Sequence, residues 1–112
     1  MSKPYSVIER IGEAAALEQL AEEAAELAQA ALKLARIVRA ENPTPVDYDT
    51  AFSSLLEELG DVRLCAAVLE EKYGKLDTSE TERRKLARWK HRLLAFYCGG
   101  RGELHAEQER PL

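Results

Sequence analysis

Four acidic side chains stand in two pairs with the same spacing, in two stretches whose residue pattern predicts helix. The first pair is Glu23 and Glu26, and the second pair is Glu58 and Asp61. Residues three apart on an α-helix differ by about 60° around the axis and by about 4.5 Å along it. The two carboxylates of each pair can therefore converge on one ion.

The chemistry that these acids predict is the binding of a divalent cation. If the two helices pack antiparallel, the two pairs can face each other, and carboxylates at close range raise one another's pKa unless a cation joins them. A ligand set of oxygen atoms favours Mg²⁺, with Mn²⁺ as the alternative, whereas zinc prefers histidine and cysteine. We therefore predict a Mg²⁺ site formed by Glu23, Glu26, Glu58 and Asp61. The competing interpretation is solvated surface charge, since glutamates at these spacings are common on exposed helices.

A first long helix is predicted from Val7 or Glu13 to about Ala40. Apolar residues recur along it at three- and four-residue steps, which is typical of one buried helix face: Leu17, Leu20, Ala24, Leu27, Ala31, Leu34 and Val38. Gly12 can break or kink the start of the helix, which leaves a short lead-in helix open. The prolines of the segment 42–45 end it, because proline donates no backbone hydrogen bond.

Two further helices are predicted after the prolines. The second begins near Asp47, Asp49 or Thr50, which are all suitable N-caps, and ends at Gly74. The third opens with Ser79 and Glu82 at capping-box spacing and runs to about residue 97. We expect an all-α protein whose three main helices form a four-helix-type bundle, completed by dimerisation because three such helices bury only a thin core.

Length and composition limit the remaining possibilities. A chain of 112 residues fits one domain, which we place at 1–98, followed by a polar tail at 99–112. The formal net charge of −4 argues against binding of duplex nucleic acid. No stretch approaches the roughly 20 apolar residues of a membrane span. Cys65 and Cys98 lie far apart without a CxxC motif, so we expect free thiols in a cytoplasmic protein.

Basic side chains supply candidates for binding an anion. Lys85, Arg88 and Arg92 recur at three- and four-residue steps on the third predicted helix and share one face. A metal ion combined with lysine or arginine is the usual means of neutralising a polyphosphate. The alternative is an ordinary solvated face. Lys33 and Arg36, which follow Glu26 by two to three turns, are further phosphate candidates.

The order and spacing of the acids resemble a known family signature. The chain reads Glu22-Glu23-Ala24-Ala25-Glu26 and then Glu58-Leu59-Gly60-Asp61. This resembles the EExxE and ExxD motifs of MazG-like all-α NTP pyrophosphohydrolases, and the likeness covers about residues 15 to 93. One departure lies at 83–89, where Lys85 and Arg88 align with the family's basic string but its asparagine is absent.

The resemblance implies a helical homodimer or homotetramer with Mg²⁺ on the four acids named above. It also implies cleavage of the α–β phosphate bond of an NTP or dNTP, which gives the monophosphate and pyrophosphate. Glu22 is then the candidate for orienting or deprotonating the attacking water, or for holding a second ion. Gln19 and Lys33 are candidate nucleotide contacts. Two alternatives remain open: a phosphoribosyl-ATP pyrophosphatase on the same scaffold, and a non-catalytic helical interaction module.

Overall fold

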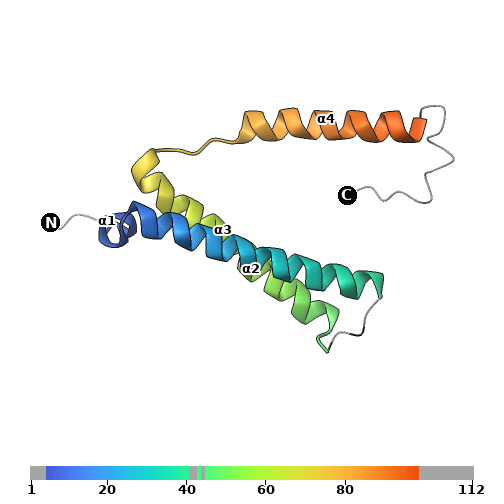
Figure 1. Ribbon diagram of the computed structural model, residues 1–112, viewed down its shortest axis with the longest axis horizontal. Helices are drawn as coiled ribbons and strands as arrows, with labels where there is room; N and C mark the ends of the chain where they lie inside the picture. The colour runs from blue at the N-terminus through green and yellow to red at the C-terminus, as the bar shows by residue number, and fades with distance from the viewer. Residues whose placement is uncertain (1–4, 41–42, 44, 99–112) are drawn as a thin grey trace. The chain divides into compact units, whose positions relative to one another are not determined.

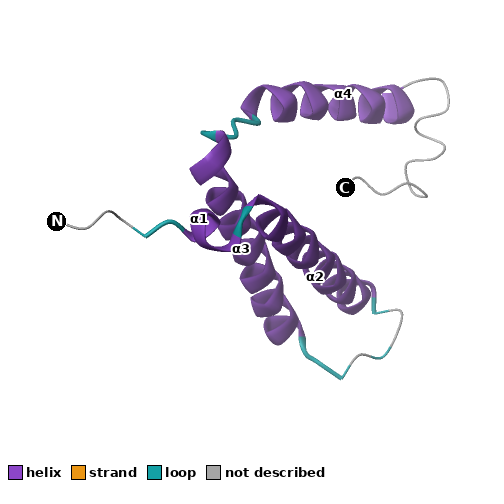
Figure 2. Ribbon diagram, turned by 60° about the vertical axis from the view of Figure 1, so that its left-hand side comes forward, coloured by secondary structure: helices purple, strands orange, loops and turns teal. Residues whose placement is uncertain are grey.

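The structure is a computed structural model that describes residues 5–40, 43 and 45–98. Within these residues it contains four α-helices and no strand, which confirms the predicted all-α class (Figure 2). They are α1 (Val7–Ile11), α2 (Glu13–Arg39), α3 (Tyr48–Tyr73) and α4 (Ser79–Cys98). The predicted tail at 99–112 lies outside the described residues.

The helices divide between two compact units, Met1–Leu76 and Asp77–Leu112. The first unit contains α1, α2 and α3, and the second contains α4. The predicted single domain at 1–98 therefore spans both units. Among the described residues, no helix is long and apolar enough to cross a membrane.

The breaks between helices follow the predicted punctuation. Gly12 has a φ of +91°, which separates the short lead-in helix α1 from α2. The Asp47 side chain accepts a 2.9 Å hydrogen bond from the Thr50 backbone N–H, so Asp47 is the N-cap of α3. Gly74, with a φ of +77°, ends α3 as predicted.

α2 and α3 lie side by side as an antiparallel hairpin, and α1 packs against both (Figure 1). The Tyr73 hydroxyl donates a 2.5 Å hydrogen bond to Glu13, which joins the end of α3 to the start of α2. The buried core of the described residues is small: Ile8, Ala16 and Leu69 form one cluster, Leu20 and Val68 pack against it, and Ala51 is buried separately on α3. This hairpin is the framework that positions the acidic residues.

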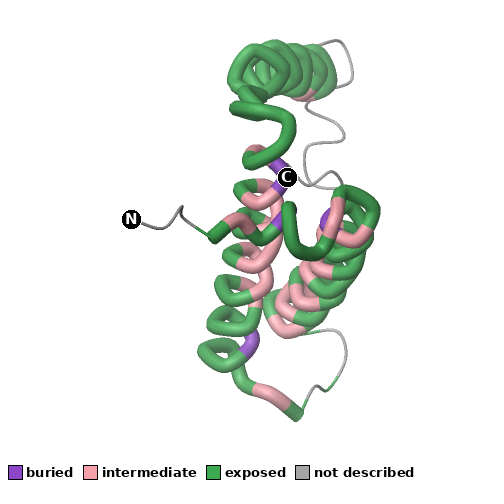
Figure 3. Tube along the Cα trace, turned by 90° about the vertical axis from the view of Figure 1, so that its left-hand side faces the viewer, coloured by how far each residue is buried: buried purple, intermediate pink, exposed green. Residues whose placement is uncertain are grey.

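α4, in the second unit, is amphipathic in sequence and contains no buried residue; Leu93 and Tyr97 are half-buried and its other residues are exposed (Figure 3). Its start differs in detail from the predicted capping box. The Glu82 side chain pairs with the Thr78 hydroxyl rather than with Ser79, and the Ser79 backbone N–H donates to the Asp77 side chain at 3.0 Å. The cap therefore begins one residue earlier than the sequence pattern predicts.

Candidate metal centre

The antiparallel hairpin brings acids from α2 and α3 together. Glu23, Glu26 and Glu58 each offer a carboxylate oxygen, and these three atoms lie within 4.8 Å of one another. Glu57, Glu58 and Asp61 form a second group that meets the same limit. Glu58 belongs to both groups, so the four predicted ligands lie in one connected acidic cluster.

Glu58 stands at the centre of this cluster in an unusual environment. Its Oε2 atom is buried and has no hydrogen-bond partner among the described residues. Burial raises the pKa of Glu58 above its ordinary value, and the neighbouring charges of Glu26 and Asp61 raise it further. Removing a carboxylate oxygen from water costs free energy when no hydrogen-bond donor replaces the water. A cation bound at this oxygen would remove that cost.

Glu23 is perturbed in the same direction. Burial is the largest cause of its raised pKa, and the charge of Glu26 adds to it. Asp61 also raises this pKa, both through its charge and as a hydrogen-bonding neighbour. Gln19 works in the opposite direction, since its side-chain amide donates a 2.9 Å hydrogen bond to Oε2 of Glu23. Gln19, predicted as a nucleotide contact, therefore also holds one of the candidate metal ligands.

Two acids differ in position from what the sequence motif suggests. Glu22 is exposed on α2 and belongs to neither acidic group of the described residues. Glu57, which the motif does not single out, belongs to the second group with Glu58 and Asp61. Its position four residues before Asp61, one helical turn away, is the sequence signal that could have identified it.

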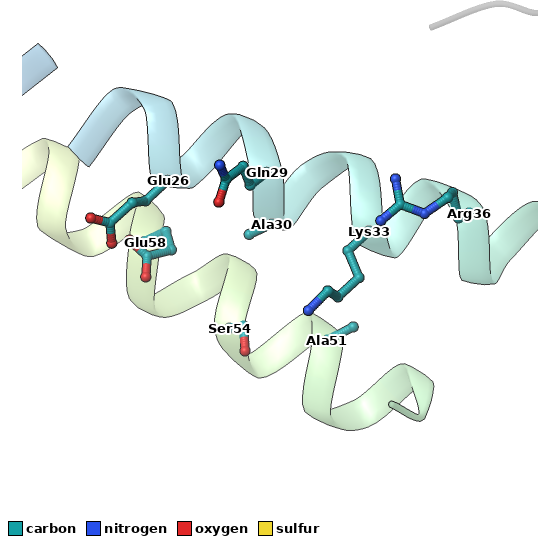
Figure 4. Close-up of a pocket in the computed structure, with 8 residues that line it drawn as sticks. All are labelled: Glu26, Gln29, Ala30, Lys33, Arg36, Ala51, Ser54 and Glu58. Carbon is teal, nitrogen blue, oxygen red and sulfur yellow. The ribbon is translucent and has the colours of Figure 1, made fainter. Parts of the chain in front are cut away.

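A pocket of about 610 Å³ opens beside the cluster between α2 and α3. Glu26 and Glu58 lie at one end of it, and Lys33 and Arg36 lie at the other (Figure 4). Figure 4 shows Lys33 reaching from α2 towards α3 near Ala51. The other residues that line this pocket are Gln29, Ala30 and Ser54. The hairpin thus places two of the predicted basic candidates beside the acids.

A second pocket, smaller and largely apolar, lies at the other end of the hairpin. It has a volume of about 240 Å³, and it is lined by Val7, Ile11, Ala16, Gln19, Leu64, Cys65 and Val68. The pKa of the Cys65 thiol is raised by burial first, and then by the charges of Glu23 and Asp61. Cys65 is half-buried and Cys98 is exposed, and both are free thiols in the structure.

The basic residues predicted on the third helix, Lys85, Arg88 and Arg92, are exposed on α4. They belong to the second unit, whereas the described residues that line the pocket of Lys33 and Arg36 come from α2 and α3 of the first unit. Their role as phosphate ligands stays a prediction.

No protein-family model, curated protein or solved structure matches the chain.

Proposed function

We propose that the protein is a Mg²⁺-dependent nucleotide pyrophosphohydrolase, which cleaves the α–β phosphate bond of an NTP or dNTP. The observation that carries the proposal is the cluster of Glu23, Glu26 and Glu58, whose carboxylate oxygens from two helices lie within 4.8 Å of one another. The buried Oε2 of Glu58, which has no hydrogen-bond partner among the described residues, supports a cation at this place. Oxygen-only ligation favours Mg²⁺, or Mn²⁺ in its place.

The residues suggest a division of roles in the reaction. Glu23, Glu26, Glu58 and Asp61 would hold the metal, which when bound supplies charge neutralisation of the phosphate oxygens and acidifies a coordinated water. The oxygen of an attacking water would form the new bond to the α-phosphorus. The bond from this phosphorus to the bridging oxygen breaks, and the oxygen leaves with pyrophosphate. Glu22, on the exposed side of α2, is proposed to accept the water's proton.

The test is pyrophosphate release from each standard NTP and dNTP, and from phosphoribosyl-ATP, in the presence of Mg²⁺. We expect release from one class of nucleoside triphosphate. Glu23→Ala and Asp61→Ala should abolish release while leaving the helical circular dichroism unchanged. Glu18→Ala, which removes an exposed acid of α2 outside the cluster, should keep full activity.

Other outcomes identify the alternatives. Release from phosphoribosyl-ATP alone would assign the scaffold to that substrate. Full activity in both Glu23→Ala and Asp61→Ala would refute the site. A wild-type protein that neither binds Mg²⁺ nor releases pyrophosphate from any of these nucleotides would be a helical interaction module instead.

We further propose that the chain works as a homodimer, or as a dimer of dimers. The buried core of the first unit is small, and large apolar side chains remain exposed on its helices. Leu32 is 61% exposed and Leu56 is 53% exposed. A second copy would bury this apolar surface. Sedimentation equilibrium should give at least twice the mass of one chain, and a monomer at micromolar concentration would contradict this proposal.

A further inference from the structure

The hairpin carries three chemically different regions in a fixed order. Along α2, Gln19 of the apolar pocket comes first, the acids Glu23 and Glu26 follow, and Lys33 and Arg36 come last. α3 runs antiparallel to α2, so the three regions occur in reverse order along its sequence. Ala51 and Ser54 line the basic end first, and Glu58 and Asp61 then join the acids. Cys65 follows and lines the apolar pocket.

The basic end of the hairpin suits a polyphosphate. Lys33 and Arg36 line the same pocket, and neither forms an ion pair with a described residue. Two cations that share a pocket repel each other unless an anion lies between them. Arginine and lysine bind phosphate oxygens through strong charge-assisted hydrogen bonds. This region therefore offers the positive charge that a triphosphate tail requires.

The apolar end suits a flat, weakly polar group instead. Among the described residues, its lining contains no charged side chain, and Gln19 and Cys65 are its polar residues. Because one Gln19 N–H group donates to Glu23, the amide is held in place. Its carbonyl oxygen and second N–H group remain for a ligand. Apolar pockets with a few placed polar groups are typical of sites for planar organic ligands, whereas a phosphate would lose its hydration here without gaining a cation.

We propose that the nucleotide lies lengthwise along the α2–α3 hairpin, with its base between Gln19 and Cys65 and its β- and γ-phosphates at Lys33 and Arg36. This inference rests on the proposed function and adds a direction to it. Lys33 follows Gln19 by fourteen positions, which corresponds to about 21 Å along α2 at about 1.5 Å per residue. An extended nucleoside triphosphate spans a comparable length. The α-phosphate then falls in the middle, at the acidic cluster.

This direction has a consequence for the reaction. The leaving pyrophosphate gains negative charge as the bond to the α-phosphorus breaks, and that charge develops beside Lys33 and Arg36. Fixed positive charge at such a position stabilises the transition state more than the ground state. The two residues should therefore affect kcat as well as KM, whereas the apolar pocket should affect mainly binding of the nucleoside part.

The first arm of the test measures pyrophosphate binding, with Mg²⁺ present, by isothermal titration calorimetry. The double variant K33A/R36A should weaken binding by about tenfold or more, which corresponds to at least about 1.4 kcal/mol. The matched control is Arg63→Ala, which removes an exposed arginine of α3 outside the pocket and should leave the affinity unchanged. Unchanged affinity in K33A/R36A would overturn the assignment of the basic end.

The second arm fills the apolar pocket. Cys65→Leu should weaken binding of the nucleoside triphosphates by about tenfold while leaving pyrophosphate affinity unchanged. Leu64→Ala, at an exposed position in the same pocket, should weaken triphosphate binding alone and serves where Cys65→Leu loses helicity. Equal weakening of pyrophosphate and triphosphate, or weakening of neither by Cys65→Leu and Leu64→Ala, would contradict the direction.

Failure of this inference differs from failure of the proposed function. If the protein hydrolyses a nucleotide and K33A/R36A leaves pyrophosphate binding unchanged, the proposed function stands and the proposed orientation of the nucleotide is wrong. If the protein hydrolyses no nucleotide but shows the expected binding differences in both arms, the proposed orientation of the nucleotide stands and the proposed hydrolysis is wrong.

Discussion

A carboxylate oxygen of Glu26 on α2 lies within 4.8 Å of one on Glu58 on α3, although 32 positions of sequence separate the two residues. Two negative charges at this distance repel each other, and the burial of the Glu58 oxygen reduces the screening by water. The hairpin therefore concentrates an unfavourable interaction at one place. Binding of a cation there would turn this repulsion into shared coordination.

Metal-free protein should lose stability as the pH rises above 4.5. Burial raises the pKa of Glu58 and of Glu23 above that ordinary value, so the folded protein holds protons that the unfolded chain has released. The contribution of these two carboxyl groups to the free energy of unfolding is fully present below pH 4.5. It is lost as the pH rises through their folded-state pKa values. Urea unfolding at a series of pH values, with a chelator present, measures this slope.

Other acids should not reverse this slope. The pKa values of Asp47 and Asp77 are lowered from 3.8 by hydrogen bonds to Thr50 and Ser79, so their contributions change below pH 3.8. Saturating Mg²⁺ should raise the unfolding free energy at pH 7. Without metal, the unfolding free energy of Glu58→Gln should depend less on pH than that of the wild type. A metal-free protein that gains stability between pH 4.5 and 7 would show that these acids do not control it.

Glu58→Gln should weaken Mg²⁺ binding more than any other single neutral replacement in the cluster. Glu58 is the residue shared by both acidic groups, and its buried oxygen lacks a partner among the described residues. We expect a loss of at least about tenfold in affinity, measured by calorimetry with Mg²⁺ and with Mn²⁺. Glu18→Gln makes the same chemical change on an exposed part of α2 and should bind as the wild type does. Equal affinities in the two variants would remove Glu58 from the site.

Gln19→Leu should make metal binding more sensitive to pH. The Gln19 amide lowers the pKa of Glu23 through its hydrogen bond, so its loss should raise that pKa and let protons compete better with the metal. Mg²⁺ affinity should therefore fall more at pH 6 than at pH 8. An equal loss at both pH values would indicate that Gln19 acts on the metal without changing the Glu23 proton affinity.

Glu71→Ala should destabilise the first unit by about 1 kcal/mol. Oε1 of Glu71 on α3 accepts hydrogen bonds from the Ser6 hydroxyl at 3.2 Å and from the Ile8 backbone N–H at 3.1 Å. The carboxylate thereby attaches α1 to α3 at the N-terminal end of α1. Thermal unfolding should show a lower Tm than in Glu18→Ala, which has no such contact. Identical Tm values in the two variants would show that the contact does not hold α1.

The local structure was predictable from sequence because its causes are local. The apolar periodicity of α2, the Asp47 N-cap of α3 and the backbone freedom of Gly12 and Gly74 act within a few residues of chain. The same short range allowed the pairs Glu23–Glu26 and Glu58–Asp61 to be recognised, since three-residue spacing on a helix has a known geometry.

The tertiary structure alone decided which side chains meet across the hairpin. The distance between Glu26 and Glu58, and the burial of the Glu58 oxygen, depend on the register of α2 against α3, which results from packing along the whole length of both helices. The same register placed Lys33 and Arg36 in a pocket with these acids. Sequence spacing specifies the face of one helix, whereas contact between two helices depends on side chains far apart in the chain.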